Sequence, residues 1–174
     1  MELHDEEVAL RPWRMEDAPA VEAACQDPEI PYWIPFVPSP YTREDADTYL
    51  RGCIESGDER HPFAIVDAGT GRLLGSIDMR VNAMRTGHIG YWVAAQARGR
   101  GIGTRALRAL VAWALDDLYL ERLELITDPD NAASRRVAEK VGFCEEGILR
   151  SHLLHTDGRR RDSVMYSLLP GELP

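Results

Sequence analysis

The sequence predicts an α/β protein in which about four helices cover a mixed, mostly antiparallel and twisted sheet of about seven strands. A length of 174 residues suits one such domain. A composition with 44% hydrophobic and 28% charged residues is typical of a globular protein. The predicted elements follow the order β-α-α-β-β-β-α-β-α-β-β, which places helices on the faces of a mixed sheet. We therefore expect a single domain over residues 1–174, with residues 8–169 as its folded core.

The N-terminal third is predicted to hold one strand and two acidic helices. Residues 8–13 (VALRPW) form the strand, and a helix follows over about 16–25, because acidic residues favour a helix N-terminus. Thr42, with an aspartate three residues later, caps a second helix over about 42–56. The intervening residues 27–41 contain five prolines, so we expect a loop without regular structure.

The rest of the chain alternates short apolar segments with two longer helical patterns. The six further predicted strands cover residues 63–66, 73–81, 88–93, 123–127, 143–155 and 161–169. Leucines, alanines and valines at helical spacing predict a helix over 102–118, and a second helix over 131–141 ends at Gly142. Turns are expected around residues 85–87 and at Asp157-Gly158.

Charge is distributed unevenly along the chain. Residues 1–60 hold 15 acidic and 5 basic residues, whereas residues 61–174 hold 14 and 15. The overall net charge of -9 argues against a nucleic-acid partner. Two interpretations of the acidic part stay open: a pair of solvated helices, or a surface that attracts a cation beside a region that can receive an anion.

The lengths of the apolar runs and the spacing of the cysteines argue against a membrane-spanning protein and against a disulfide-linked or metal-binding one. No apolar run reaches the roughly 18–20 residues of a membrane span, and the acidic start MELHDEE does not suit a secretory signal. We therefore expect a cytoplasmic protein without a membrane partner. Cys25, Cys53 and Cys144 are odd in number and widely spaced, so we expect buried reduced thiols and neither a disulfide framework nor a metal site.

A glycine-rich turn, residues 96–104 (QARGRGIGT), precedes the strongest helical pattern. Its three glycines allow several backbone N–H groups to point outward, and the helix N-terminus adds a partial positive charge. Arg98 and Arg100 add full charges and forked donors. The turn therefore predicts a site for phosphate or pyrophosphate; the alternative is a flexible turn with solvated arginines. Thr104 stands where a Walker loop needs lysine, and the Rossmann pattern Gly-x-Gly-x-x-Gly is not met.

Several segments together resemble one enzyme family. Arg98, Gly101 and Gly103 match the pyrophosphate signature Arg/Gln-x-x-Gly-x-Gly/Ala of the GNAT superfamily of acetyl-CoA-dependent N-acetyltransferases. Further segments resemble its Rim-type branch, which acetylates the N-termini of ribosomal proteins: Gly90-Tyr91-Trp92-Val93, Asn131-Ala132-Ala133-Ser134, Glu139-Lys140-Val141-Gly142-Phe143, and Asp157-Gly158 with Asp162 and Tyr166. The resemblance runs from Val8 to Leu169.

The resemblance implies the GNAT fold, in which two central parallel strands splay apart and form an acyl-CoA cleft. Backbone groups at Val93 would pair with the pantetheine, and the N–H groups of the glycine-rich turn would bind the pyrophosphate. Asn131 would reach the pantetheine arm, or serve only as a helix cap. The implied residues for acetyl-CoA are Trp92, Val93, Arg98, Gly99, Arg100, Gly101, Ile102, Gly103, Thr104, Asn131 and Ser134.

The resemblance also implies direct attack of a neutral amine on the thioester, which requires a proton acceptor. His88 stands where many family members carry a glutamate base, and His88, Gly90 and Trp92 share one strand face. An imidazole, with an ordinary pKa near 6.5, can take that role, or His88 has no role. In the Rim branch the base comes from a later strand, where Leu153 stands beside His152, so His152 is a second candidate.

Ser134 is implied as the hydrogen-bond partner of the departing thiolate, because the Rim branch uses the serine of Asn-x-x-Ser. Many family members use a tyrosine instead, at the position where this chain has Ala138. The alternative for Ser134 is a capping role beside Asn131. No Gly-x-Ser-x-Gly motif supports a hydrolase.

The acceptor side is implied to lie on the acidic N-terminal part. There Tyr32, Trp33 and Phe36 are predicted to bind an amine, through cation–π contacts and charge attraction, or else to form core or homodimer contacts. The predicted function is transfer of the acetyl group of acetyl-CoA to a primary amine, either a protein N-terminus or a small molecule, in a ternary complex. The alternative is an acyl-CoA-binding module or sensor with weak or lost catalysis, which the missing glutamate and tyrosine favour.

Overall fold

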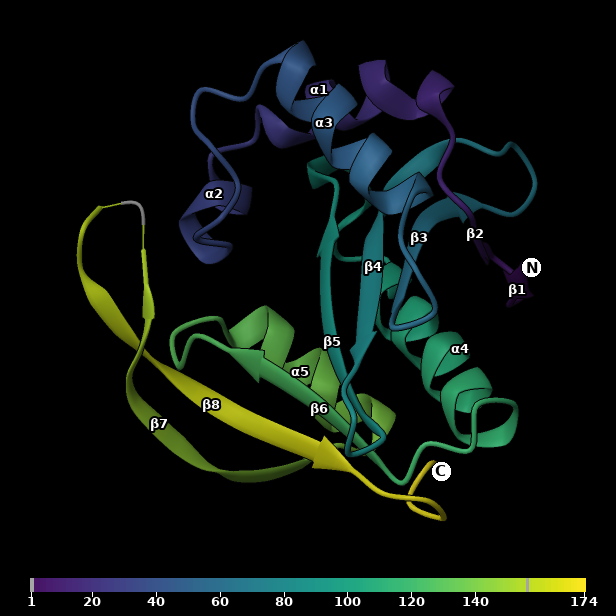
Figure 1. The fold of residues 1–174 in the computed structure, drawn as a ribbon, viewed down its shortest axis with the longest axis vertical. Coiled ribbons are helices and arrows are strands. Elements are labelled where there is room, and N and C mark those ends of the chain that lie inside the picture. Colours follow the sequence, from purple (N-terminus) through teal and green to yellow (C-terminus); the bar gives the residue numbers. More distant parts are fainter. Residues whose placement is uncertain (1, 156) are drawn as a thin grey trace.

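The computed structural model describes residues 2–155 and 157–174, which form one mixed sheet with helices on both faces (Figure 1). The strand order is β1-β2-β3-β4-β5-β6-β8-β7, and only β5 and β6 are parallel neighbours within this part of the chain. The strands are β1 (Leu3–His4), β2 (Val8–Arg11), β3 (Arg60–Asp67), β4 (Leu73–Val81), β5 (Thr86–Val93), β6 (Arg122–Thr127), β7 (Cys144–Leu154) and β8 (Arg160–Leu168). The α-helices are α1 (Ala18–Cys25), α2 (Glu29–Trp33), α3 (Arg43–Ile54), α4 (Ile102–Asp116) and α5 (Ala132–Val141), with 3-10 turns η1 (Met15–Asp17) and η2 (Ala95–Ala97).

The predicted fold class is confirmed, with eight strands and five α-helices in the described residues rather than about seven and four. The extra strand, β1, has two residues, too few to show a period-2 pattern. The turn expected around residues 85–87 lies earlier, at residues 82–85, because Thr86 already begins β5. Cys25 and Cys53 are buried as expected, whereas Cys144 is exposed at the start of β7.

The extra helix, α2, lies inside the segment predicted to be irregular, so that prediction was wrong. Pro28 is the N-cap of α2 and Pro31 lies in its first turn, where no backbone N–H is needed. Ile34 ends the helix in an extended conformation, as expected for a residue before a proline, here Pro35. The five prolines therefore limit the length of the helix without preventing it.

Two hydrophobic clusters hold the helices on the sheet. On one face α4 buries Leu107 and Leu110 in a cluster that includes Ile77 of β4. On the other face α1 and α3 bury Val21 and Leu50 in a second cluster, which includes the β3 side chains that point to that face. None of the helices in residues 2–155 and 157–174 is long and apolar enough to cross a membrane.

The two parallel strands diverge at the centre of the sheet. β5 pairs with β6 from Thr86 to Ile89, but it continues to Val93 without that partner. On its other side β5 stays paired with β4, since Gly75 still lies opposite Val93. β6 instead follows β8 as far as Thr127. The ribbons of β5 and β6 therefore separate toward their carboxyl ends, as Figure 1 shows, and the expected splayed strands are confirmed.

Gly75 allows β4 and β5 to lie close together next to the divergence. A Cβ atom there would lie 2.3 Å from the Trp92 carbonyl oxygen and 3.2 Å from the Val93 Cα atom. Both are backbone atoms, which cannot move without moving the strand. Gly90, on β5, has no atom within 4 Å of the same hypothetical Cβ position.

We predict that Gly75→Ala lowers the free energy of unfolding by about 1–3 kcal/mol, because the added methyl group forces the two strands apart. The matched variant Gly90→Ala should be neutral or more stable by up to about 1 kcal/mol, since it only restricts the unfolded chain. Urea denaturation of both variants measures the difference. Equal stabilities would show that the close approach at Gly75 is not required.

Candidate active site

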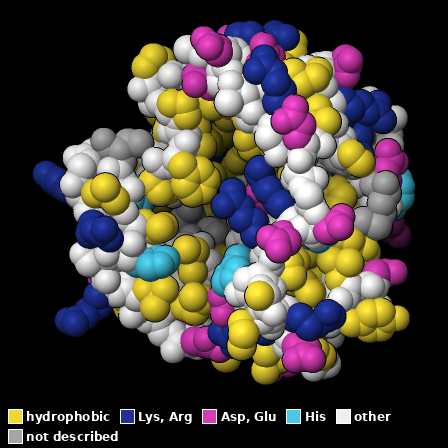
Figure 2. Space-filling view, viewed as in Figure 1, with side chains coloured by type: hydrophobic (Ala, Val, Ile, Leu, Met, Phe, Trp, Pro, Cys, Tyr) yellow, Lys and Arg dark blue, Asp and Glu magenta, His cyan; other side chains and the backbone are white. Residues whose placement is uncertain are grey.

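Two cavities meet where β5 leaves β6. The smaller, of about 510 Å³, lies between the end of β5, the glycine-rich turn and the N-terminus of α5. The larger, of about 1080 Å³, lies between the α2–α3 segment and the face formed by β4, β5 and β6. Figure 2 shows this face hollowed near its centre, with hydrophobic side chains around the hollow. The residues that line both cavities are Trp33, Ile34, Tyr91, Trp92 and Ser134.

The glycine-rich turn presents backbone to the smaller cavity. Gly99 and Gly101 have φ angles of +73° and +80°, which side chains disfavour, and Gly101 is the N-cap of α4. The first N–H groups of a helix have no partner within it, so those of α4 can bind an anion here. Gly103 has Tyr91 and Val93 side-chain atoms 3.5 and 3.6 Å from where its Cβ would lie, so a larger residue would fill the cavity. The predicted cofactor residues that line this cavity are Trp92, Val93, Arg98, Gly99, Gly101, Ile102, Gly103, Thr104, Asn131 and Ser134.

The sequence predicts that Arg98 and Arg100 both direct their charge to a pyrophosphate, but the structure places the two side chains differently. Arg98 lines the smaller cavity, but its guanidinium group forms ion pairs with Asp27 and Glu29. Its Nε donates a hydrogen bond of 3.0 Å to the Val93 carbonyl oxygen. Arg100 is not among the described residues that line either cavity. The charge of Arg98 is therefore engaged by two carboxylates, whereas the backbone of the turn faces the smaller cavity.

Asn131 and Ser134 begin α5 on the opposite side of the smaller cavity. The Asn131 Oδ1 accepts a 3.0 Å hydrogen bond from the Ser134 backbone N–H, so Asn131 caps the helix, and it also lines the cavity. The Ser134 hydroxyl lies 3.0 Å from the hydroxyl of Tyr91 on β5. Burial raises the pKa of Tyr91 to about 12, so this phenol keeps its proton at neutral pH and can donate to Ser134. The prediction had not included Tyr91 in the site.

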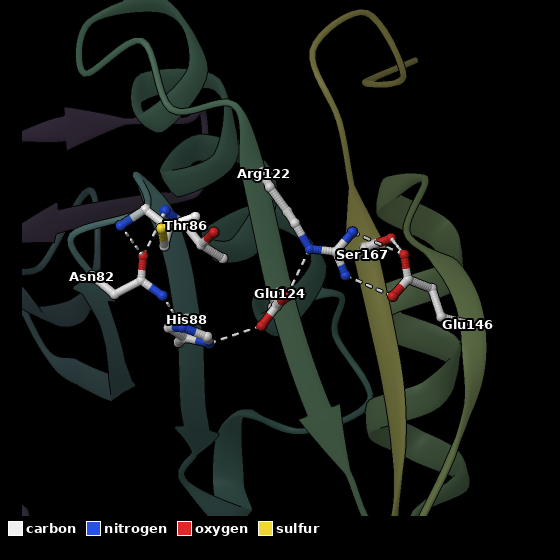
Figure 3. Close-up of polar contacts among 8 residues, drawn as sticks. Asn82, Thr86, His88, Arg122, Glu124, Glu146 and Ser167 are labelled. Carbon is white, nitrogen blue, oxygen red and sulfur yellow. Dashed lines mark hydrogen bonds and ion pairs between the residues drawn. The ribbon is translucent and has the colours of Figure 1, made fainter.

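His88 lies on the floor of the larger cavity, and both of its ring nitrogens have partners (Figure 3). Its Nδ1 is 3.0 Å from the Glu124 carboxylate, and its Nε2 is 3.1 Å from the Asn82 Nδ2. The Asn82 Oδ1 accepts the backbone N–H groups of Met84 and Thr86, which leaves its NH₂ group to donate to His88. Nε2 therefore accepts the hydrogen bond from Asn82, and Nδ1 carries the hydrogen directed at Glu124.

A chain of ion pairs continues from Glu124 across the neighbouring strands (Figure 3). Arg122 on β6 contacts Glu124 at 2.6 Å and Glu146 on β7 at 2.6 Å, and Ser167 on β8 donates a 2.7 Å hydrogen bond to Glu146. The hydrogen bonds from Arg122 and Ser167 lower the pKa of Glu146 to about 2. These ion pairs lie where β5 and β6 are still paired, so they support the closed end of the divergence.

The second candidate base, His152, contacts Ser163, which lines the larger cavity, but His152 does not line it. Its Nδ1 is 3.1 Å from the Ser163 hydroxyl, and the residue is exposed and absent from the described lining of either cavity. Leu153 and His155 line the larger cavity instead, and His155 is buried. The described residues contain no group of three or more His, Cys, Asp or Glu side chains arranged to hold a metal ion.

The three predicted acceptor aromatics are placed differently. Trp33 lines both cavities, and Phe36 lines the larger one with 81% of its surface exposed. Tyr32 is outside the described lining of both cavities and lies under the guanidinium group of Arg161, 4.4 Å from its ring centre. Among these three, the structure therefore brings Trp33 and Phe36 to the site.

Arginines from the rest of the chain neutralise part of the acidic N-terminal surface. Asp5 and Glu7 pair with Arg105, as Asp27 and Glu29 do with Arg98. Five acidic residues line the larger cavity, Glu44, Asp45, Asp78, Asp128 and Asp162, against two arginines, Arg60 and Arg80. Among the described residues the wall of that cavity therefore stays acidic, although only two of these carboxylates come from the N-terminal part.

Comparison with known proteins places this geometry in a family. The acetyltransferase (GNAT) domain matches residues 7–144. YdaF of Bacillus subtilis (strain 168), a proposed ribosomal N-acetyltransferase, is 37% identical over 150 residues, covering 80% of this chain and 78% of YdaF. The structure of RimJ of Mycobacterium smegmatis in complex with CoA-disulfide is similar with a TM-score of 0.83 and 32% identity, covering 96% of this chain and 84% of RimJ. A GNAT-family acetyltransferase of Bacillus anthracis has the same fold, with a TM-score of 0.88 at 23% identity over 97% of this chain and 98% of its own.

The family match covers the diverging strands, the glycine-rich turn and the start of α5. These are the elements that form the smaller cavity. The chain therefore belongs to the GNAT family of acetyltransferases.

Proposed function

We propose that this protein transfers the acetyl group of acetyl-CoA to a primary amine, such as the N-terminus of a protein, in a ternary complex. The observation that carries the proposal is the junction of two cavities at Tyr91, Trp92 and Ser134, beside the diverging strands. In the smaller cavity the backbone of the turn suits a pyrophosphate, and the larger cavity leaves room for an acceptor. The complex of RimJ with CoA-disulfide and the name of YdaF support the cofactor and the acceptor class.

Residues of this chain fit the two ends of acetyl-CoA. The N–H groups of residues 99–104 would hold the pyrophosphate at the N-terminus of α4. The backbone N–H of Ala94 donates to the carbonyl oxygen of Leu74 on β4. Because successive residues of a strand direct their N–H and C=O groups to opposite sides, those of Val93 face away from β4, toward the opening between β5 and β6. There they would pair with the pantetheine as a further strand would.

When bound, acetyl-CoA supplies the thioester, whose carbon–sulfur bond is replaced by a carbon–nitrogen bond to the amine. Ser134, supported by the Tyr91 hydroxyl, would donate a hydrogen bond to the departing sulfur. A backbone N–H near Val93 would face the carbonyl oxygen, where negative charge develops. His88 would take the proton of the amine through water on Nε2 when the Asn82 amide turns away from that nitrogen, and Glu124 would accept the Nδ1–H of the resulting imidazolium.

The test is thiol release from acetyl-CoA with a panel of acceptors. The panel holds short peptides with N-terminal serine or alanine, the same peptides with blocked N-termini, a polyamine and an amino sugar. Release that requires a free amine supports the proposal. Acetyl-CoA binding in calorimetry without release for any amine would instead indicate a binding module.

We predict that Gly101→Val weakens acetyl-CoA binding at least about tenfold, equivalent to about 1.4 kcal/mol. The φ angle of +80° is unfavourable for valine, so the turn must change and its N–H groups are redirected. Gly71→Val is the matched control, with a φ of +71° in a turn outside both cavities. Calorimetry with unchanged affinity in a folded Gly101→Val protein would contradict the pyrophosphate assignment.

For the leaving group, Ser134→Ala should lower kcat by roughly 10–100-fold, and Tyr91→Phe by less, with the acetyl-CoA Kd retained. The chain offers a matched pair, because Tyr49 and Ser76 also share a hydroxyl hydrogen bond, of 2.8 Å. Tyr49→Phe should leave kcat within about twofold and change only the acceptor KM, because this pair lines the larger cavity and not the smaller one. Steady-state kinetics with the best acceptor of the panel measures all three. Wild-type kcat in Ser134→Ala would remove Ser134 from the mechanism.

For the base, His88→Ala should lower the acetylation rate by roughly 10²-fold while acetyl-CoA affinity is kept. Steady-state kcat/KM of wild type, His88→Ala and His152→Ala tests this. Loss in His152→Ala alone would move the role to β7.

A further inference from the structure

We propose that Arg98 is a positioning residue that holds α2 over the junction of the two cavities and so determines acceptor binding rather than acetyl-CoA affinity. This inference rests on the proposed function of the site. It differs from what the family signature implies, because the resemblance assigns Arg98 to the pyrophosphate.

The contacts of Arg98 join segments that are far apart in the sequence. Its Nε donates to the carbonyl oxygen of Val93, the last residue of β5, at 3.0 Å. Its Nη1 donates to the Glu29 carboxylate at 2.9 Å, 69 residues away, and its Nη2 pairs with Asp27. One side chain therefore connects the open edge of β5 to the start of α2.

The chemistry of these contacts requires a guanidinium group. A planar fork can donate to one carbonyl and one carboxylate while its charge pairs with a second carboxylate, whereas a lysine ammonium group is a single point charge. The pair is partly shielded from water, since the Asp27 side chain is 16% and the Arg98 side chain 34% exposed. A contact of this kind holds its geometry better than an exposed ion pair.

The opposite side of α2 is held by a second arginine. Arg161 of β8 donates a 3.2 Å hydrogen bond to the Tyr32 carbonyl oxygen and covers the Tyr32 ring. In Figure 1, α2 lies between the α1–α3 layer and the β7–β8 hairpin. Arg98 follows β5, and Arg161 lies on β8, the neighbour of β6. The two arginines therefore contact α2 from the two parts of the sheet that diverge.

The position of α2 depends on such contacts, because a helix of five residues is not stable alone. At its carboxyl end Trp33 and Ile34 line both cavities. Loss of the Arg98 contacts would release the start of α2 and shift these two side chains. The backbone N–H groups of the glycine-rich turn would stay in place, so acetyl-CoA would still bind.

The test compares Arg98→Gln, the pair Asp27→Asn with Glu29→Gln, and the triple variant. Arg105→Gln is the matched control, because Arg105 also pairs with two carboxylates, Asp5 and Glu7, and lies outside the described lining of both cavities. With an N-terminal serine peptide as acceptor, Arg98→Gln should raise the acceptor KM by about tenfold or more, with kcat and the acetyl-CoA Kd within about twofold. The carboxylate pair should give the same increase, and the triple variant no more, because the three groups act as one contact. Arg98→Lys, which keeps the charge without the fork, should restore only part of the loss.

Hydrogen exchange provides a measurement that does not depend on activity. The backbone amides of residues 29, 30 and 32–34 should exchange faster in Arg98→Gln and at the wild-type rate in Arg105→Gln. An acetyl-CoA affinity that falls tenfold in Arg98→Gln, with unchanged acceptor KM and unchanged exchange at residues 29–34, would overturn the inference and make Arg98 a pyrophosphate ligand. Additive effects in the triple variant would also contradict it. A wild type without transferase activity would contradict the proposed function, and the exchange rates would then still decide whether Arg98 holds α2.

Discussion

β5 keeps its pairing with β4 as far as Val93, whereas its pairing with β6 ends at Ile89. An open strand edge is therefore created inside the sheet, between two strands that each remain held on their other side. The peptide groups of this edge have no partner on β6, so the edge can pair with an extended molecule that carries amide groups. The glycine-rich turn follows β5 directly and places the N-terminus of α4 beside the same opening.

Polar contacts fix both ends of the divergence. At the closed end, Glu124 and Arg122 of β6 connect His88 of β5 to the outer strands. At the open end, Tyr91 of β5 contacts Ser134 of α5 across the smaller cavity. The reacting groups are thus carried by strands and by a helix N-terminus rather than by long loops, which keeps their separation defined.

The sequence predicted the elements with strong local patterns, and the contacts between distant segments were not predictable from it. Glycine spacing and helical periodicity correctly predicted the turn and α4, whereas the prolines led to the wrong conclusion about α2. The partners of Arg98 and the Tyr91–Ser134 contact join residues 69 and 43 positions apart. Spacing patterns carry no information on such pairs, so the resemblance assigned Arg98 to a ligand, and Tyr91 was not identified as part of the site.

The central claim is that the opening between β5 and β6 holds acetyl-CoA with its thioester at the junction of the two cavities. A crystal structure of the protein with CoA tests it most directly. We expect the pantetheine to lie along Val93 between the two strands, the pyrophosphate on the N–H groups of residues 99–104, and the sulfur beside Ser134. A CoA molecule bound outside this opening, or one whose pyrophosphate lies away from the turn, would contradict the account.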